Sequence, residues 1–97
     1  MEISIEVSGE INRYIVFNID GDWIFCDESI SSALGISLFE YKQRFKNICN
    51  ISDTGYGIVI NDEIISDEEI IKRFEQEFAS ELVILKMEGC NLKKKHF

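Results

Sequence analysis

Histidine, proline and long hydrophobic runs are scarce in this sequence, and two of these scarcities bear directly on function. The 97 residues include no proline and a single histidine, His96, next to the end. A Cys–His or Ser–His catalytic pair would therefore depend on a chain end, where order is commonly lost. The longest apolar runs, such as residues 82–85, are far too short to cross a bilayer. We therefore expect no membrane segment and a cytoplasmic protein.

Cysteine is also limited, to Cys26, Cys49 and Cys90. Their odd number, wide spacing and lack of a CxxC pair favour neither a disulfide framework nor a zinc site, so we expect buried, reduced thiols. The sequence contains no GxGxxG, no phosphate loop and no cluster with metal-ligand spacing. We therefore expect no cofactor, no bound metal and no enzymatic activity.

Basic residues are outnumbered, and the charge is unevenly distributed. Eighteen Asp and Glu residues against ten Lys and Arg residues give a net charge of -8. Residues 1–41 carry eight acids against Arg13 alone, whereas residues 42–46 contribute three cations and no acid. Residues 47–92 hold ten acids against three cations, and three lysines follow them. The sequence thus predicts an acidic protein with one cluster of cations ahead of its C-terminal lysines. We call this cluster, residues 42–46, the basic island.

Alternating hydrophobicity predicts a three-stranded meander at the N-terminus. Ile3 and Ile5 belong to one face of a half-buried strand. A second strand is expected over residues 13–19, and the Asp-Gly pair at 20–21 favours a tight turn into a third strand at 23–25. The three strands are expected to pair in antiparallel order.

Two short helices joined at Gly35 are predicted to follow. Asp27 is placed to cap the first helix, and Gly35 can adopt the left-handed conformation that ends it after Leu34. Ser37 and Glu40 form a capping box for the second helix. The buried face of that helix recurs at intervals of three and four and comprises Leu38, Tyr41, Phe45, Ile48 and Cys49.

The strongest helix signal lies in the second half of the chain. Ser66 and Glu69 form another capping box, ahead of an apolar stripe at helical spacing. Before this helix we expect a polar loop over residues 50–57 and a strand from Tyr56 to Ile60. The stripe consists of Ile70, Ile71, Phe74, Phe78 and Leu82.

Residues 82–87 are predicted as a last strand, because they form an apolar run of strand length directly after the helix. The element order is then β-β-β-α-α-β-α-β, which predicts an α+β fold with an antiparallel sheet. We expect a single domain over residues 1–92 and a short basic tail over residues 93–97.

Residues 29–45 carry a motif of two helices around a glycine corner. Small Ser31 lies four residues before Gly35, and Tyr41 is placed as the inward anchor of the second helix. This pattern resembles the helix-turn-helix of bacterial and phage regulators. The resemblance implies a DNA-binding transcriptional regulator, although two helices packed for structure alone would share most of it. The residues placed to contact DNA are Phe39, Lys42, Gln43, Arg44 and Lys46.

The acidic residues suggest a different function, protein binding, from the DNA binding considered above. An anionic surface can imitate phosphates and occupy a basic groove on another protein. Trp23, beside a turn, is not clearly assigned to the core; it would add contact area in a complex, or pack in the core instead. Carboxylates at a helix N-terminus can instead serve only to stabilise the helix dipole. The candidate protein-binding residues are Asp20, Asp22, Trp23, Asp27, Glu28, Asp62, Glu63, Asp67 and Glu68.

One further motif is the tripeptide Asp53-Thr54-Gly55, which matches the active-site tripeptide of aspartic proteases. The preceding Asn50-Ile51-Ser52 is not the apolar strand found in those enzymes, and the helix-rich centre conflicts with their all-β fold. We therefore expect a polar turn here.

Acidity, abundant isoleucine, the lack of proline and a compact α+β layout are similar in type to small accessory proteins of phages and mobile elements, including anti-CRISPR inhibitors. This resemblance implies a non-catalytic inhibitor or regulator, monomeric or homodimeric, that binds a host protein with a basic, nucleic-acid-binding surface. The alternative is the DNA-binding regulator described above.

Overall fold

The computed structural model describes residues 1–55 and 57–94 of the chain. Tyr56, the expected start of a strand, and residues 95–97 of the expected tail lie outside the described residues. The fold combines helices with sheets, which confirms the α+β prediction. None of the helices in the described part of the chain is long and apolar enough to span a membrane.

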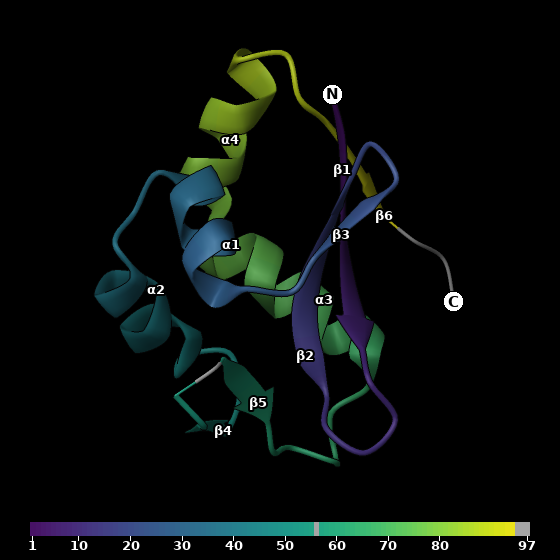
Figure 1. Ribbon diagram of the computed structural model, residues 1–97, viewed down its shortest axis with the longest axis vertical. Helices are drawn as coiled ribbons and strands as arrows, with labels where there is room; N and C mark the ends of the chain where they lie inside the picture. The colour runs from purple at the N-terminus through teal and green to yellow at the C-terminus, as the bar shows by residue number, and fades with distance from the viewer. Residues whose placement is uncertain (56, 95–97) are drawn as a thin grey trace.

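Four strands form the main sheet, in the order β3-β2-β1-β6 (Figure 1). The first three strands pair in antiparallel order, as the meander predicts, but β6 runs parallel to β1. The sheet is therefore mixed rather than purely antiparallel. Its strands are β1 (Glu2–Ser8), β2 (Tyr14–Ile19), β3 (Asp22–Ile24) and β6 (Asn91–Lys94).

Helices cover one face of this sheet (Figure 1). Two of them begin where serine side chains accept hydrogen bonds from backbone N–H groups: Ser37 from Glu40, and Ser66 from Glu69. Both predicted N-terminal caps are thus confirmed. The helices are α1 (Asp27–Leu34), α2 (Leu38–Phe45), α3 (Asp67–Glu77) and α4 (Ala79–Met87).

A small hairpin of β4 (Ile51–Asp53) and β5 (Ile58–Ile60) extends the fold beyond the start of β2. The backbone N–H of Ile60 donates to the carbonyl of Arg13 at 2.8 Å. The segment expected to be a loop over residues 50–57 therefore contains a strand, because Ile51 and its neighbours pair with the apolar β5.

An aromatic cluster forms the centre of the core. Phe74 contacts Phe78 with ring centroids 4.7 Å apart, and Tyr41 lies 5.5 Å from Phe78. Phe17 of β2 meets Phe74 edge to face at 5.9 Å. These contacts hold α2 and α3 against the sheet, and the rings are among the largest fully buried side chains of the core.

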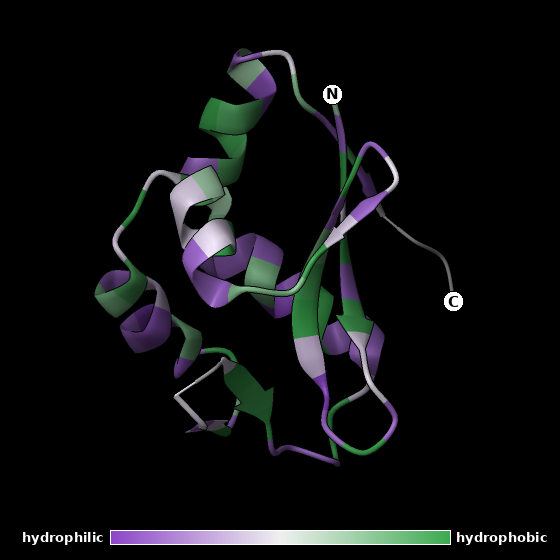
Figure 2. Ribbon diagram, in the orientation of Figure 1, coloured by the Kyte–Doolittle hydropathy of each residue, from purple (hydrophilic) through white to green (hydrophobic). Residues whose placement is uncertain are grey.

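The expected strand over residues 82–87 is wrong, because this segment is helix α4. Hydrogen bonds from Phe78 to Phe74 and from Leu82 to Phe78 continue the helical pattern past the break between α3 and α4. Leu82 and Leu85 are buried, whereas the adjacent Val83 and Ile84 are exposed. In Figure 2 the middle of the α4 ribbon has the colour of hydrophobic residues.

The last strand comes after α4 instead, and the backbone of Lys94 belongs to it. Lys93 forms an ion pair with Glu2 of β1 at 3.1 Å. The first two residues of the expected basic tail are therefore part of the sheet.

The three cysteines are free thiols, but only Cys49 and Cys90 are buried. Cys26 is exposed, which corrects the expectation for that residue. It is the residue immediately before α1, and its side chain makes no capping hydrogen bond.

Candidate functional site

A polar hollow of about 610 Å³ opens where the β1–β2 loop meets the β5–α3 loop. Both loops lie at the lower end of the molecule in Figure 1. We call this region the acidic hollow. Its lining includes Glu10, Asn12, Arg13, Asn61, Glu63 and Asp67.

The shape of the β1–β2 loop depends on Gly9. This residue has a φ of 108°, a value that side-chain-bearing residues rarely adopt. A Cβ atom at this position would lie 1.8 Å from the carbonyl oxygen of Asn12. Glycine therefore permits the tight loop that presents Glu10 and Ile11 at the edge of the hollow.

Arg13 joins the two sides of the hollow. Its guanidinium donates hydrogen bonds to the carbonyls of Asp62, at 2.6 Å, and Ile65, at 2.9 Å. It also forms an ion pair with the carboxylate of Asp67. Because guanidinium presents several donors in a rigid plane, one side chain can hold the whole β5–α3 loop against the start of β2.

The other acids around the hollow are left uncompensated. Among the described residues, Glu10 and Glu63 of its lining form no ion pair, nor does Glu68, which follows the lining residue Asp67 in the first turn of α3. Ile11 is 95% exposed and Ile64 is 96% exposed, so each loop also projects an apolar side chain. Negative charge and exposed apolar side chains thus occur together here: Ile11 is part of the lining, and Ile64 lies between the lining residues Glu63 and Ile65 in the sequence. Apolar contact points surrounded by polar groups are typical of protein interfaces.

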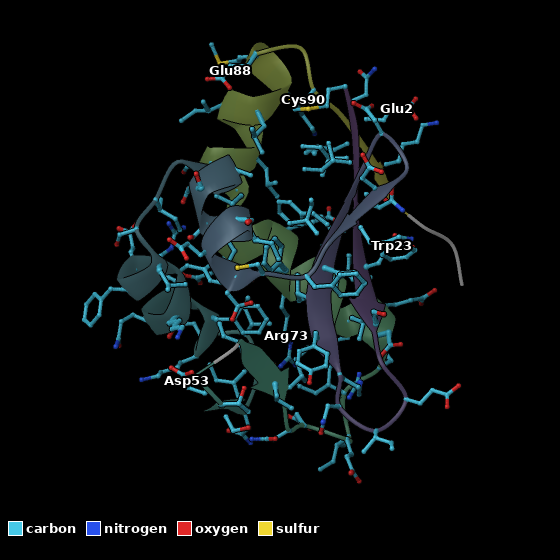
Figure 3. The ribbon with its side chains drawn as sticks, viewed as in Figure 1. Glu2, Trp23, Asp53, Arg73, Glu88 and Cys90 are labelled. Atoms are coloured by element: carbon cyan, nitrogen blue, oxygen red, sulfur yellow. The ribbon has the colours of Figure 1, made fainter. Side chains whose placement is uncertain are left out.

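The predicted acidic residues do not form one face. Asp20 and Asp22 follow β2, whereas the acidic hollow lies at the strand's start. Six residues rising about 3.3 Å each separate the two ends by roughly 20 Å. Trp23 lies near the Asp20 end, where it is 43% exposed and stacks on Phe25 at 6.1 Å. Figure 3 shows Trp23 on the sheet side of the molecule.

Asp27 is buried, which corrects its assignment to an exposed binding surface. It is also the first residue of α1 rather than its cap. Its side chain is 6% exposed and lies against the backbone of Gly57. Burial raises the pKa of the Asp27 carboxyl, and the backbone N–H of Ile58 and the charge of Lys42 offset this only partly. The neighbouring Glu28 is exposed.

The basic island on α2 is largely neutralised by acids from other elements. Lys42 forms an ion pair with Asp53 at 2.9 Å, and this contact lowers the pKa of the Asp53 carboxyl. Arg44 donates to Glu81 and Glu77, and those contacts raise the pKa of its guanidinium. The remaining three candidates for DNA contact, Phe39, Gln43 and Lys46, are exposed.

The Asp53-Thr54-Gly55 tripeptide forms the polar turn expected of it. One carboxylate oxygen of Asp53 accepts a hydrogen bond from the backbone N–H of Gly55 at 2.9 Å. The other carboxylate oxygen contacts Lys42, so both are engaged in local structure. Within residues 1–55 and 57–94, no group of three or more His, Cys, Asp or Glu side chains could hold a metal ion.

Sequence reasoning missed Glu10 and Ile11, which line the hollow, and the exposed Ile64 next to its lining residue Glu63. The available signal was the place of each isoleucine outside any alternating or helical pattern: Ile11 lies between polar Glu10 and Asn12, and Ile64 follows two acids and precedes Ile65. Their proximity depends on the Arg13 contacts, which join residues about fifty positions apart in the chain.

Comparisons of the chain with protein-family models, with curated proteins and with solved structures gave no match.

Proposed function

We propose that this protein is a non-catalytic, acidic protein-binding module that inhibits or regulates a partner with a basic, nucleic-acid-binding surface. The observation that carries the proposal is the acidic hollow, whose lining includes exposed Ile11 together with Glu10 and Glu63, two acids that form no ion pair among the described residues. Exposed Ile64 and Glu68 adjoin residues of this lining in the sequence. The partner would be a host protein of the kind bound by anti-CRISPR inhibitors, and the carboxylates would occupy positions that phosphates otherwise take.

The charge of the molecule supports this proposal. Its net charge of -8 raises the local concentration of basic partners and speeds their association at low salt. Charged groups at the rim contribute mainly to the association rate, whereas apolar anchors contribute to the lifetime of the complex. Glu10, Glu63 and Glu68 would take the first role, and Ile11 and Ile64 the second.

The test is affinity capture from the native host with the tagged chain, comparing Glu63→Lys with Glu88→Lys. Both substitutions change the net charge by the same amount, and Figure 3 shows Glu88 at the end of α4, away from the acidic hollow. We expect a partner that the wild-type chain and Glu88→Lys retain, that Glu63→Lys loses at least about tenfold, and that nucleic acid displaces. Capture that is equal for the two variants, or no captured protein, would contradict the proposal.

The DNA-binding alternative is less favoured, because Lys42 and Arg44 already pair with acids beside them. A DNA reader needs free cations that displace counterions from phosphates. The same preparation tests it: binding to random duplex DNA that rises steeply as salt is lowered would favour the alternative over the first proposal.

A further inference from the structure

Helix α4 carries a second apolar stripe besides the one that packs in the core. The buried stripe consists of Phe78, immediately before the helix, Leu82 and Leu85. On the opposite side, Val83 and Ile84 are each 53% exposed and Met87 is 82% exposed. A helix that is apolar on all sides is normally covered on all sides. The outer side of α4 is therefore a contact surface whose occupant has to be identified.

The spacing of the exposed stripe suits a helix packed against a copy of itself. Ser80, Val83, Ile84 and Met87 stand at positions i, i+3, i+4 and i+7, which share one side of a helix. This spacing is the same when it is read in either direction. In two antiparallel copies related by a twofold axis, Met87 therefore meets Ser80 of the other copy, and Val83 meets Ile84. Small, exposed Ser80 leaves room for the long and adaptable side chain of Met87.

Charge also favours this side of the molecule for contact between two copies. Each chain has a net charge of -8, so two copies repel each other wherever exposed acids come together. The one acid within α4 is Glu81, which is only 8% exposed and pairs with Arg44. Lys86 and Glu88, at the end of the helix, carry opposite charges. By contrast, the other three helices of the described residues each have an exposed acid: Glu28, Glu40 and Glu68.

The same features disfavour other occupants. A basic partner is attracted by exposed acids, which this side of α4 lacks. Helices that lie on membranes have several Lys or Arg residues on their polar side, whereas α4 contains Lys86 alone. An uncharged apolar stripe is complementary to another uncharged apolar stripe, and a second copy of the chain supplies one of the same length.

We propose that two copies of this protein form a homodimer through the exposed stripes of α4, packed antiparallel about a twofold axis. The nine residues of α4 extend about 14 Å, so the contact is smaller than the ~800 Å² per partner of a stable interface. We therefore expect a dissociation constant on the order of 100 µM. Figure 1 shows α4 at the opposite end of the molecule from the loops of the acidic hollow, so the dimer leaves both hollows accessible.

Sedimentation equilibrium of the whole chain at protein concentrations up to about 1 mM tests the dimer. We expect dimerisation to strengthen at least about threefold as salt rises from about 0.1 M to 1 M, because screening reduces the repulsion between two acidic chains while the apolar contact remains. A chain that stays monomeric throughout, or a dimer that weakens as salt is added, would overturn the inference. This experiment needs no host partner, so its failure is separate from a failure of the affinity capture.

Variants on the stripe locate the contact. Val83→Glu and Met87→Glu should each weaken dimerisation at least about tenfold, because each places two carboxylates in an apolar contact. The matched control is Phe39→Glu, the same kind of change at a residue of α2 that is 74% exposed; it should alter dimerisation by no more than about twofold. Circular dichroism establishes that each variant is folded, and either stripe variant serves if the other is not. Equal effects at the stripe and at Phe39 would refute the contact.

The antiparallel arrangement has its own test. Ser80→Glu and Met87→Lys should each weaken self-association, but a mixture of the two variants should form a heterodimer at least about fivefold more stable than either homodimer, because the new charges then meet across the axis. No preference for the heterodimer would contradict this packing. Vesicles of neutral phosphatidylcholine test the other occupant. A monomeric chain that binds them and loses this binding in Val83→Glu would assign the stripe to a membrane and overturn the inference.

Discussion

At the scale of single residues, Arg13 joins two segments that lie far apart in the chain. It makes hydrogen bonds to two carbonyls of the β5–α3 loop and an ion pair with Asp67, the first residue of α3. We expect Arg13→Met to lower the free energy of unfolding by about 1–3 kcal/mol, because charge-assisted hydrogen bonds are lost while the acceptors stay partly buried. Urea denaturation measures the change. Lys46→Met, at an exposed cation, should shift stability by no more than about 0.5 kcal/mol; equal effects would contradict this role.

A second residue-scale prediction concerns Asp27. Its pKa is raised in the folded state, so the folded chain holds this proton more tightly than the unfolded chain. Stability therefore falls as pH rises from the ordinary aspartate value of about 3.9 through the raised one. We expect Asp27→Asn, which is neutral throughout, to be more stable than the wild type at pH 7 and equal to it below about pH 3.9. Urea midpoints measured across this range provide the test, with Glu28→Gln as the matched control. A stability difference between Asp27→Asn and the wild type that does not vary with pH would show that ionisation is not its cause.

The burial of Asp27 also shows why parts of the site could not be predicted. An aspartate before a helical segment is typical of an exposed cap, and the sequence around it is polar. Its burial depends on the turn at Gly55 and Gly57, about thirty residues later. The abundance of acidic residues was visible in the sequence. That Asp20 and Asp22 lie at the opposite end of β2 from the acidic hollow is visible only in the structure.

At the scale of elements, the serine caps give the clearest prediction. Ser37 and Ser66 each satisfy a backbone N–H in the first turn of a helix. Ser37→Ala and Ser66→Ala should each cost about 1 kcal/mol of stability, with a range of roughly 0.5–2 kcal/mol. Ser32→Ala, at an exposed position inside α1, is the control and should be neutral or slightly stabilising, because alanine has the higher helix propensity. A loss at Ser32 as large as the loss at the caps would contradict the capping explanation.

The elements differ in how well local patterns predicted them. Two of the local signals extend over only a few residues: the alternation at Ile3 and Ile5, and the capping serines. The strand and the two helices that they predict, β1, α2 and α3, are present in the structure. The apolar run at residues 82–85 suits a strand or a buried helix equally. The prediction of a strand there relied on the length of the run and was therefore wrong. Gly89, with a φ of 92°, ends α4 and was the overlooked local signal. The polar β6 was not predictable, because its pairing with β1 connects the two ends of the chain.

At the scale of the whole molecule, the net charge of -8 sets up repulsion among carboxylates that lack cations. Glu63 is exposed beside Glu10 and Asp67 in the acidic hollow. We expect Glu63→Lys to raise the free energy of unfolding by up to about 0.5 kcal/mol at low salt, since it relieves this repulsion. The gain should disappear near 1 M salt, where the screening length falls to about 3 Å. Lys46→Glu, the reverse change on α2, should lower stability at low salt and recover it at high salt. Urea denaturation at both ionic strengths measures these effects. A gain for Glu63→Lys that persists at high salt would point to local packing at the hollow instead of long-range charge.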